Sequence, residues 1–311
     1  MVLFRVLAGL VALLSCALAG ISPACAQTAM PDRPLRVLLI PADGGTEDGT
    51  RADFLPLFNA ISASTGLRFE VMTGHSYAAV IEGMCSGLAD IAWFGAASYI
   101  EARERGCAEL LAVEVTGGES QYYAGLFVRS DAAIDDIEAL RGRSLAVGSV
   151  HSTSSFIYPV SMLLDVGLDP VRDLAAIRIT DSHANALRAV QAGAVDAAAA
   201  SFDSYARAVT RGALGEGELR VLARSAPIPN PPLALNPALP DAVKAALRDA
   251  LARVHEAPGV TPDMVRGYGG KRVDRYDVTV TDALIDEAAG RMARVGGRVT
   301  DEIVAAAGRS R

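Results

Sequence analysis

SYAAVIEGMCSGLADIAWFGAASYIEARERG (residues 76–106) decides the fold class of this chain. Residues 76–87 have a helical pattern, residues 88–95 read as an apolar strand, and residues 96–106 read as a second helix that ends at Gly106. Strands that alternate with helices of about ten to fifteen residues predict a parallel sheet with helices on both faces.

The same alternation continues on both sides of this stretch. Before it, the pattern predicts strands at 35–42 and 68–74 around a helix at 52–66. After it, a second series predicts helices at 136–142, 156–167, 184–193 and 203–212 and strands at 144–150, 174–180 and 194–202. Two successive α/β units predict two lobes with a cleft between them, the first part of lobe 1 over residues 35–125 and lobe 2 over residues 126–223.

The last third of the chain returns to lobe 1. A strand over residues 219–223 precedes a segment with four prolines, which rule out a regular helix there and favour an extended return crossing; they are Pro227, Pro229, Pro231 and Pro232. Helices such as residues 238–256 follow, so residues 224–311 are predicted to hold the return crossing and the C-terminal helices of lobe 1.

The N-terminus has the pattern of an export signal. Residues 6–20 form an apolar run that is too short for a comfortable membrane span. The run ends in Ala24-Cys25-Ala26, which has the small-x-small form of a signal-peptidase site. We therefore predict a signal peptide over residues 1–26 and a periplasmic location. A lipid anchor on Cys16 or Cys25 is the alternative, although neither follows a convincing Leu-small-small motif.

Composition narrows the function. The net charge is −7, and loss of Arg5 with the signal makes it one unit more negative, which argues against binding to nucleic acid or to anionic lipid. The remaining cysteines, Cys85 and Cys107, lie in a compartment that permits pairing, and we favour a disulfide over a zinc site. No metal and no cofactor is predicted.

A hydroxyl cluster lies between a strand and a helix in SLAVGSVHSTSSFIYPVS (residues 144–161). Pro159 is tolerated only in the first helical turn, so the helix begins near Ser154 or Ser155. Ser152 and Thr153 then belong to the helix N-terminus and its lead-in, where unpaired N–H groups and the helix dipole attract oxyanions. Ordinary helix capping uses one of the four hydroxyls of residues 152–155 and leaves the other three without an explanation.

His183 has a similar position, at the end of a strand and just before a helix. Its loop is expected at the same sheet edge as Ser152, because ligands of open α/β sheets collect at the carboxyl ends of the strands. A capping or surface histidine is the alternative, and His75 is a third loop histidine of this kind. No Gly-x-Ser-x-Gly elbow, P-loop or His-Glu-x-x-His motif is present, so no catalytic residues are predicted and a hydrolytic enzyme is the less favoured class.

Three stretches together resemble the periplasmic phosphonate- and phosphite-binding proteins of ABC importers. They are residues 76–102, 147–170 and 182–203, and the likeness extends from about residue 35 to about residue 275 in the same order. The resemblance implies a two-lobed periplasmic-binding-protein type II fold that traps its ligand by hinge closure.

The resemblance also implies the residues of the site. In that family a Ser-Thr-Ser helix N-terminus holds the phosphonate oxygens, a histidine after the next strand contacts the same group, and two tyrosines line the cleft. The matching positions are Ser152, Thr153, Ser154, His183, Tyr77 and Tyr122, with Tyr123 as the second register and packing in the crossing as the plain alternative for the tyrosines.

Departures from the family pattern bear on specificity. Ser155 replaces a glycine, which adds a Cβ and a hydroxyl where the backbone is close to the ligand. Members that bind 2-aminoethylphosphonate surround its ammonium with two carboxylates; here Asp203 is one, and Asn230 or Pro231 stands where the second would fall. An aminophosphonate is therefore not the expected ligand. The Gly- and acid-rich segment 41–53 adds contacts through Thr46 or Arg51, or is a rim.

These observations predict a secreted, monomeric solute-binding protein that delivers a small phosphorus oxyanion to the membrane permease of an ABC importer. A protein of the same fold for another small solute, or one that serves a sensor kinase, is the alternative.

Overall fold

The computed structural model describes residues 32–41 and 47–309. The predicted signal peptide and Thr46 lie outside these residues. Within the two described ranges, none of the helices combines the length and the apolar character that a membrane crossing requires.

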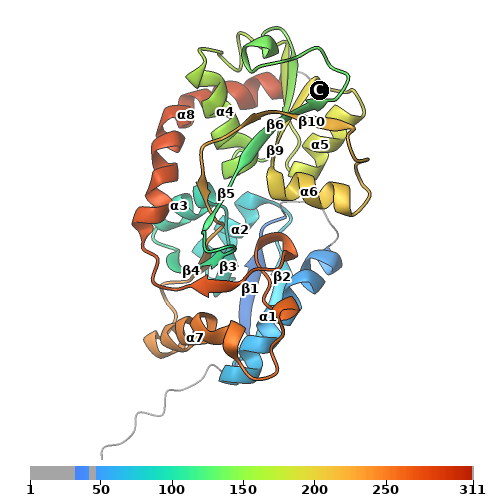
Figure 1. The fold of residues 1–311 in the computed structure, drawn as a ribbon. Helices are drawn as coiled ribbons and strands as arrows, with labels where there is room; N and C mark the ends of the chain where they lie inside the picture. Colours follow the sequence, from blue (N-terminus) through green and yellow to red (C-terminus); the bar gives the residue numbers. More distant parts are fainter. Residues whose placement is uncertain (1–31, 42–46, 310–311) are drawn as a thin grey trace, which may run out of the picture. The chain divides into compact units, whose positions relative to one another are not determined.

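The first sheet has six strands in the order β13-β4-β12-β3-β1-β2 (Figure 1). Its strands are β1 (Leu35–Leu39), β2 (Phe69–Thr73), β3 (Ile91–Trp93), β4 (Glu109–Val115), β12 (Leu233–Leu235) and β13 (Arg275–Asp277). Its helices α1 (Glu47–Thr65) and α7 (Asp241–Arg253) pack with Val37 and Leu39, whereas α2 (Tyr77–Cys85) and α3 (Ala96–Glu104) pack on the other face. Alternate residues of β1 thus face opposite layers, as strand geometry requires. We call this sheet with these helices lobe 1.

The second sheet has five strands in the order β10-β6-β9-β7-β8. They are β6 (Ala124–Arg129), β7 (Ser144–Val147), β8 (Ala176–Ile179), β9 (Ala197–Ser201) and β10 (Leu219–Arg224). Helices α5 (His183–Gln191) and α6 (Phe202–Thr210) cover one face, and η2 (Thr153–Ile157) with α4 (Tyr158–Asp165) covers the other. The central strand β9 is buried throughout and is almost all alanine, which lets both helical layers approach it closely. We call this sheet with these helices lobe 2.

The predicted parallel pairing is present in both sheets, but each sheet also contains antiparallel strands. β1, β2 and β3 pair in parallel, as do β7, β8 and β9, but β12 pairs antiparallel with β3 and β4, and β13 with β4. In the second sheet β6 pairs antiparallel with both β9 and β10. β6 and β12 directly follow the extended crossing strands β5 (Gln121–Tyr122) and β11 (Ile228–Pro229). A parallel neighbour would require a long crossover connection instead.

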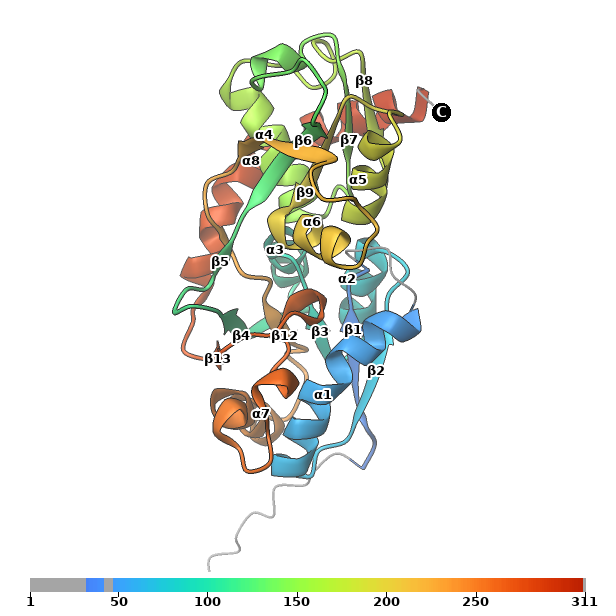
Figure 2. The ribbon, with the colours of Figure 1, turned by 45° about the vertical axis from the view of Figure 1, so that its right-hand side comes forward.

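The two crossing segments pair with each other (Figure 2). β5 (Gln121–Tyr122) and β11 (Ile228–Pro229) form a short antiparallel ribbon, and the Asn230 N–H donates to the Ser120 carbonyl at 2.9 Å. The proline-rich segment thus contains an extended strand, and within it the structure forms no regular helix.

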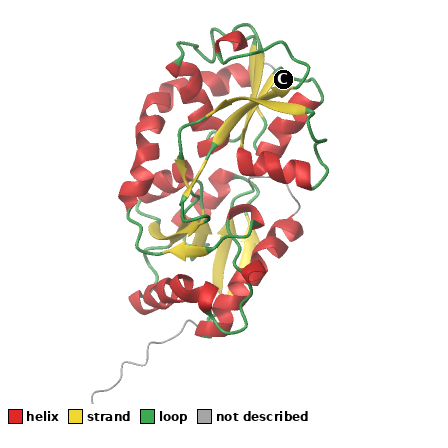
Figure 3. Ribbon diagram, viewed as in Figure 1, coloured by secondary structure: helices red, strands yellow, loops and turns green. Residues whose placement is uncertain are grey.

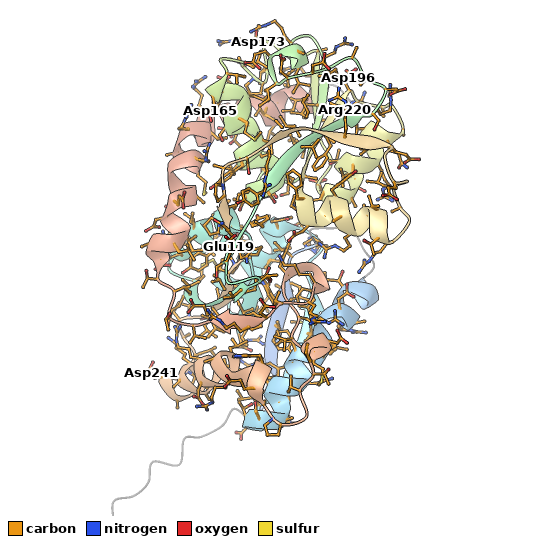
Figure 4. The ribbon with its side chains drawn as sticks, viewed as in Figure 1. Glu119, Asp165, Asp173, Asp196, Arg220 and Asp241 are labelled. Carbon is orange, nitrogen blue, oxygen red and sulfur yellow. A yellow bond between two sulfur atoms is a disulfide. The ribbon has the colours of Figure 1, made fainter. Side chains whose placement is uncertain are left out.

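The C-terminal helix α8 (Asp282–Arg309) contacts α3 of lobe 1 and α4 and β8 of lobe 2 (Figure 3). Near its start, Arg103 of α3 pairs with Asp282 at 3.1 Å and with Asp286 at 2.6 Å. Farther along, Arg291 and Arg294 pair with Asp165 at the end of α4 (Figure 4). Residues 224–311, assigned to lobe 1 from sequence, therefore also contact α4 and β8 through this helix.

Short helices complete the fold, and one covalent bridge strengthens lobe 1. The short helices are η1 (Glu138–Leu140), η3 (Val254–Glu256), η4 (Pro262–Met264) and η5 (Tyr268–Gly270). Cys85 at the end of α2 and Cys107 before β4 form a disulfide with their Cα atoms 4.7 Å apart, which confirms the predicted bridge.

Candidate functional site

Helix N-termini gather where the parallel strands end. α2, α3, η2, α5 and α6 each begin within a few residues after β2, β3, β7, β8 and β9, respectively, and their N-cap residues are Ser76, Gly95, Ser152, Ser182 and Ser201. Each of these serines accepts a hydrogen bond from the N–H three residues on, which leaves other N–H groups of the first turn for a ligand. Such N-termini attract anions.

A π-helical turn opens the helix at the hydroxyl cluster. Sequence placed the start near Ser154 or Ser155, but the turn begins at Thr153, with i to i−5 hydrogen bonds such as Ile157 N–H to the Ser152 carbonyl at 3.1 Å. In a regular helix the ring of Pro159 would clash with the Ser155 carbonyl. The wider turn avoids this clash, and that carbonyl accepts the Gly148 N–H at 3.0 Å instead.

The three predicted hydroxyl donors are buried and have different partners. Ser152 Oγ accepts the Ser155 N–H at 3.2 Å and caps its own helix. Thr153 Oγ1 accepts the Ala97 N–H at 2.8 Å, so the N-terminus of α3 in lobe 1 directly faces that of η2 in lobe 2. The Ser154 hydroxyl is hydrogen-bonded to Tyr122. Thr153 therefore ties the lobes together in addition to the donor role expected from sequence.

Ser155 lies beside Gly148. A Cβ placed on Gly148 would be only 2.1 Å from Ser155 Oγ, so the serine side chain fills the space that the glycine leaves. Within the described residues this buried hydroxyl has no hydrogen-bond partner. The extra serine is thus accommodated by a glycine at the end of β7, a compensation that the sequence pattern did not indicate.

His183 is buried at the N-terminus of α5. Its Nδ1 accepts the Ser201 N–H at 2.9 Å. The neutral ring then carries its proton on Nε2, which can donate to an anion. The structure thus connects His183 to the N-terminus of α6, the helix that carries Asp203.

The predicted tyrosines belong to the same neighbourhood. Tyr77 and Tyr122 are buried, and burial raises the pKa of the Tyr122 phenol, with Tyr77 and Asp203 raising it further and the Ser154 hydrogen bond opposing it. Tyr122 therefore remains a neutral hydroxyl at physiological pH. Tyr123, the second register, instead stacks under the Arg224 guanidinium, 3.5 Å from the ring centroid.

Asp203 is engaged by a lysine that sequence reasoning did not single out. Lys271 Nζ lies 2.6 Å from Asp203 Oδ2 and 2.8 Å from Oε1 of Glu114, a fully buried acid in β4. A glutamate inside the apolar strand ELLAVEV was a usable signal for such a site. Asn230, where a second acid was sought, is buried and donates to the Glu114 carbonyl at 2.9 Å.

Two further candidate residues are exposed rather than buried. His75 is exposed, and Arg51 is exposed on α1. His151, inside the hydroxyl stretch, was not among the predicted site residues; its Nδ1 is 2.8 Å from Glu101 Oε2 of α3, so it also contacts lobe 1.

Solved structures show the same fold. A binding protein component of an ABC phosphonate transporter from Pseudomonas aeruginosa matches with a TM-score of 0.72 and 22% identity, over 90% of this chain and 98% of that chain. PhnD1 from Prochlorococcus marinus, in complex with methylphosphonate, matches with a TM-score of 0.71 and 16% identity, over 84% and 97% of the two chains. The protein therefore has the type II fold of periplasmic binding proteins, as predicted.

Sequence comparison shows the family. Residues 45–274 match the family of periplasmic substrate-binding proteins of phosphonate ABC transporters, and the chain belongs to it. The phosphate-import protein PhnD from Mycolicibacterium smegmatis is 29% identical over 248 residues, which are 75% of each chain. Members are substrate-binding transport proteins and not enzymes, as predicted, and the family implies a periplasmic or extracytoplasmic location, a small-molecule ligand and a permease partner.

Proposed function

We propose that the protein binds a small phosphorus oxyanion, such as a phosphonate, phosphite or phosphate, at the helix N-termini around Ser152, Thr153 and Ser154. The supporting observation is the direct approach of two helix N-termini, where the Ala97 N–H meets Thr153 Oγ1 at 2.8 Å. Two facing positive dipole ends with buried hydroxyls between them are stabilised by an anion that accepts from both.

Neighbouring groups complete the proposed site. His183 offers its Nε2 proton, Tyr77 and Tyr122 offer hydroxyls, and Asp203 borders the site from α6. A tetrahedral oxyanion has enough acceptor oxygens for several such donors. We further propose that a monomer cleaved after Ala26 carries this ligand to the permease.

Calorimetry with methylphosphonate, phosphite, phosphate and 2-aminoethylphosphonate tests the ligand class. At least one of the first three should bind, and silence from all four anions contradicts the proposal. Replacing Ser152 and Thr153 together with Ala should weaken that binding more than tenfold, about 1.4 kcal/mol or more, because two donors are lost.

Two controls separate binding from folding. Ser161→Ala removes an equally buried serine hydroxyl of α4, one that donates to the Tyr158 carbonyl, and should leave the affinity unchanged. Because Ser152 and Thr153 also cap helices, Ser154→Ala serves as a variant without a capping role and should weaken binding severalfold. Unchanged affinity in both the double variant and Ser154→Ala would show that the hydroxyl cluster only caps helices and does not bind the ligand.

A further inference from the structure

Lys271 holds two carboxylates from different parts of the fold. Its ammonium lies 2.6 Å from Asp203 Oδ2 in the first turn of α6 and 2.8 Å from Glu114 Oε1 in β4. Glu114 is fully buried, whereas 25% of the Lys271 side chain and 36% of the Asp203 side chain are exposed. One cation therefore serves an acid from each lobe.

A lysine is an unusual choice in this chain. Only Lys244 and Lys271 are lysines, and all other basic side chains apart from histidine are arginines. An ammonium is a compact point charge that fits between two carboxylates, whereas a guanidinium is a wide planar fork. Lysine is therefore the basic residue better suited to position 271, between the carboxylates of Asp203 and Glu114.

The ammonium keeps its charge in this setting. Burial lowers the pKa of Lys271, but Glu114 and Asp203 outweigh burial and leave the pKa above its usual value. Burial raises the pKa of Glu114, against the opposing effect of Lys271. The Lys271 ammonium therefore gives Asp203 a charged partner at 2.6 Å.

This charge cluster adjoins the proposed anion site. Asp203 follows Ser201 by two residues, and the Ser201 N–H is bonded to His183. Asp203 also acts electrostatically on Tyr122, the partner of Ser154. Lys271 and Asp203 line a hollow of about 330 Å³ at α6 and η5. A ligand held by Ser154 and His183 thus lies near the carboxylate of Asp203, which is already paired with Lys271.

We propose that Lys271 determines the charge class of the ligand. Its ammonium occupies the carboxylate that would otherwise receive a positive group, so the site selects oxyanions whose other end is uncharged over those that carry an ammonium. A ligand ammonium placed here would lie beside Lys271 without a free carboxylate, which is unfavourable. This inference rests on the proposed function and names the ligand class of the same site.

Lys271→Met tests the inference, because methionine keeps the apolar stem and removes the charge. Calorimetry measures the ratio of the affinities for methylphosphonate and 2-aminoethylphosphonate. The unmodified protein should favour methylphosphonate at least tenfold, and the variant should shift the ratio toward 2-aminoethylphosphonate at least tenfold. Lys271→Gln, which retains hydrogen-bond donors, serves if the methionine variant does not fold.

Matched variants assign the effect. Lys244→Met removes the other lysine, which lies on α7 and has its Nζ 2.7 Å from Oε2 of Glu109 on β4. This variant should leave the ratio of the two affinities unchanged. Adding Asp203→Asn to Lys271→Met should abolish the gain for 2-aminoethylphosphonate. If the unmodified protein binds methylphosphonate but the ratio is the same in folded Lys271 variants, the inference is overturned while the proposed function stands. If the unmodified protein binds none of the four anions, the proposed function itself fails.

Discussion

Gly148 and Ser155 form a pair in which one residue makes room for the other. The Gly148 backbone lies outside the left-handed region, so glycine is not required there for its conformation. Space is the requirement, because an added Cβ would be 2.1 Å from Ser155 Oγ and 2.8 Å from Ser155 Cβ. Ser155 stands where the family pattern has a glycine, and Gly148, seven residues earlier at the end of β7, leaves the space for its side chain.

Gly148→Ala should therefore lower the free energy of unfolding by about 1–3 kcal/mol through overpacking. Ser155→Gly removes both atoms that the new methyl group would meet, so the double variant should be less destabilised than the sum of the single variants. Urea unfolding of the four proteins in this cycle measures the coupling. Strictly additive effects would show that the two side chains do not compete for the same space.

The two ends of helix α2 have different roles, one in ligand binding and one in stability. Its N-terminus, with Tyr77, belongs to the proposed site, while its C-terminus carries Cys85, which is bonded to Cys107. The bridge encloses β3 and α3 in a closed loop of the chain. Ligand contacts and the covalent constraint thus act at opposite ends of one helix.

Replacing both cysteines with Ala should lower the free energy of unfolding by about 3 kcal/mol, as expected for a loop of this length. The affinity for the oxyanion should change by less than about twofold, because the bridge lies at the far end of α2. Urea unfolding and calorimetry measure the two quantities, and reduction of the unmodified protein should reproduce the loss of stability. A large loss of affinity would contradict this separation.

Contacts between the lobes extend along α6. Asp203, Arg207 and Arg211 are spaced four residues apart, and they contact Lys271, the Gly269 carbonyl and Asp53 of lobe 1. The Arg211–Asp53 pair is 3.0 Å long and partly exposed, and it lies at the C-terminal end of α6. We propose that these contacts form together with the ligand site when the two lobes close around a ligand.

Arg211→Ala should weaken oxyanion binding by roughly two- to fivefold, because an exposed ion pair contributes up to about 1 kcal/mol to the closed arrangement. The difference from the unmodified protein should shrink at high salt. Arg298→Ala, which breaks an exposed pair with Glu302 within α8, is the matched control. Calorimetry at two salt concentrations measures the effect, and equal affinities at low salt would exclude a role for α6 in closure.

The sequence by itself determined the α/β alternation and the helix that begins at the hydroxyl cluster, and it favoured the extended proline-rich segment and the disulfide that the structure contains. These features depend on short-range patterns: hydrophobic periodicity, the missing N–H of proline, and the position of cysteines in the chain. Family membership confirmed the class of protein. Ser152 and His183 lie at the starts of η2 and α5, which follow the neighbouring strands β7 and β8.

Only the tertiary structure decided what those residues meet. The antiparallel strands depend on how the crossings enter each sheet, and the tie between Thr153 and Ala97 joins residues that are 56 positions apart. Lys271 reaches Asp203 and Glu114 from a loop far along the chain, and nothing near it in sequence indicates these partners. Electrostatic selectivity depends on distances of a few ångströms between side chains, and distances of that kind arise only when remote segments pack together.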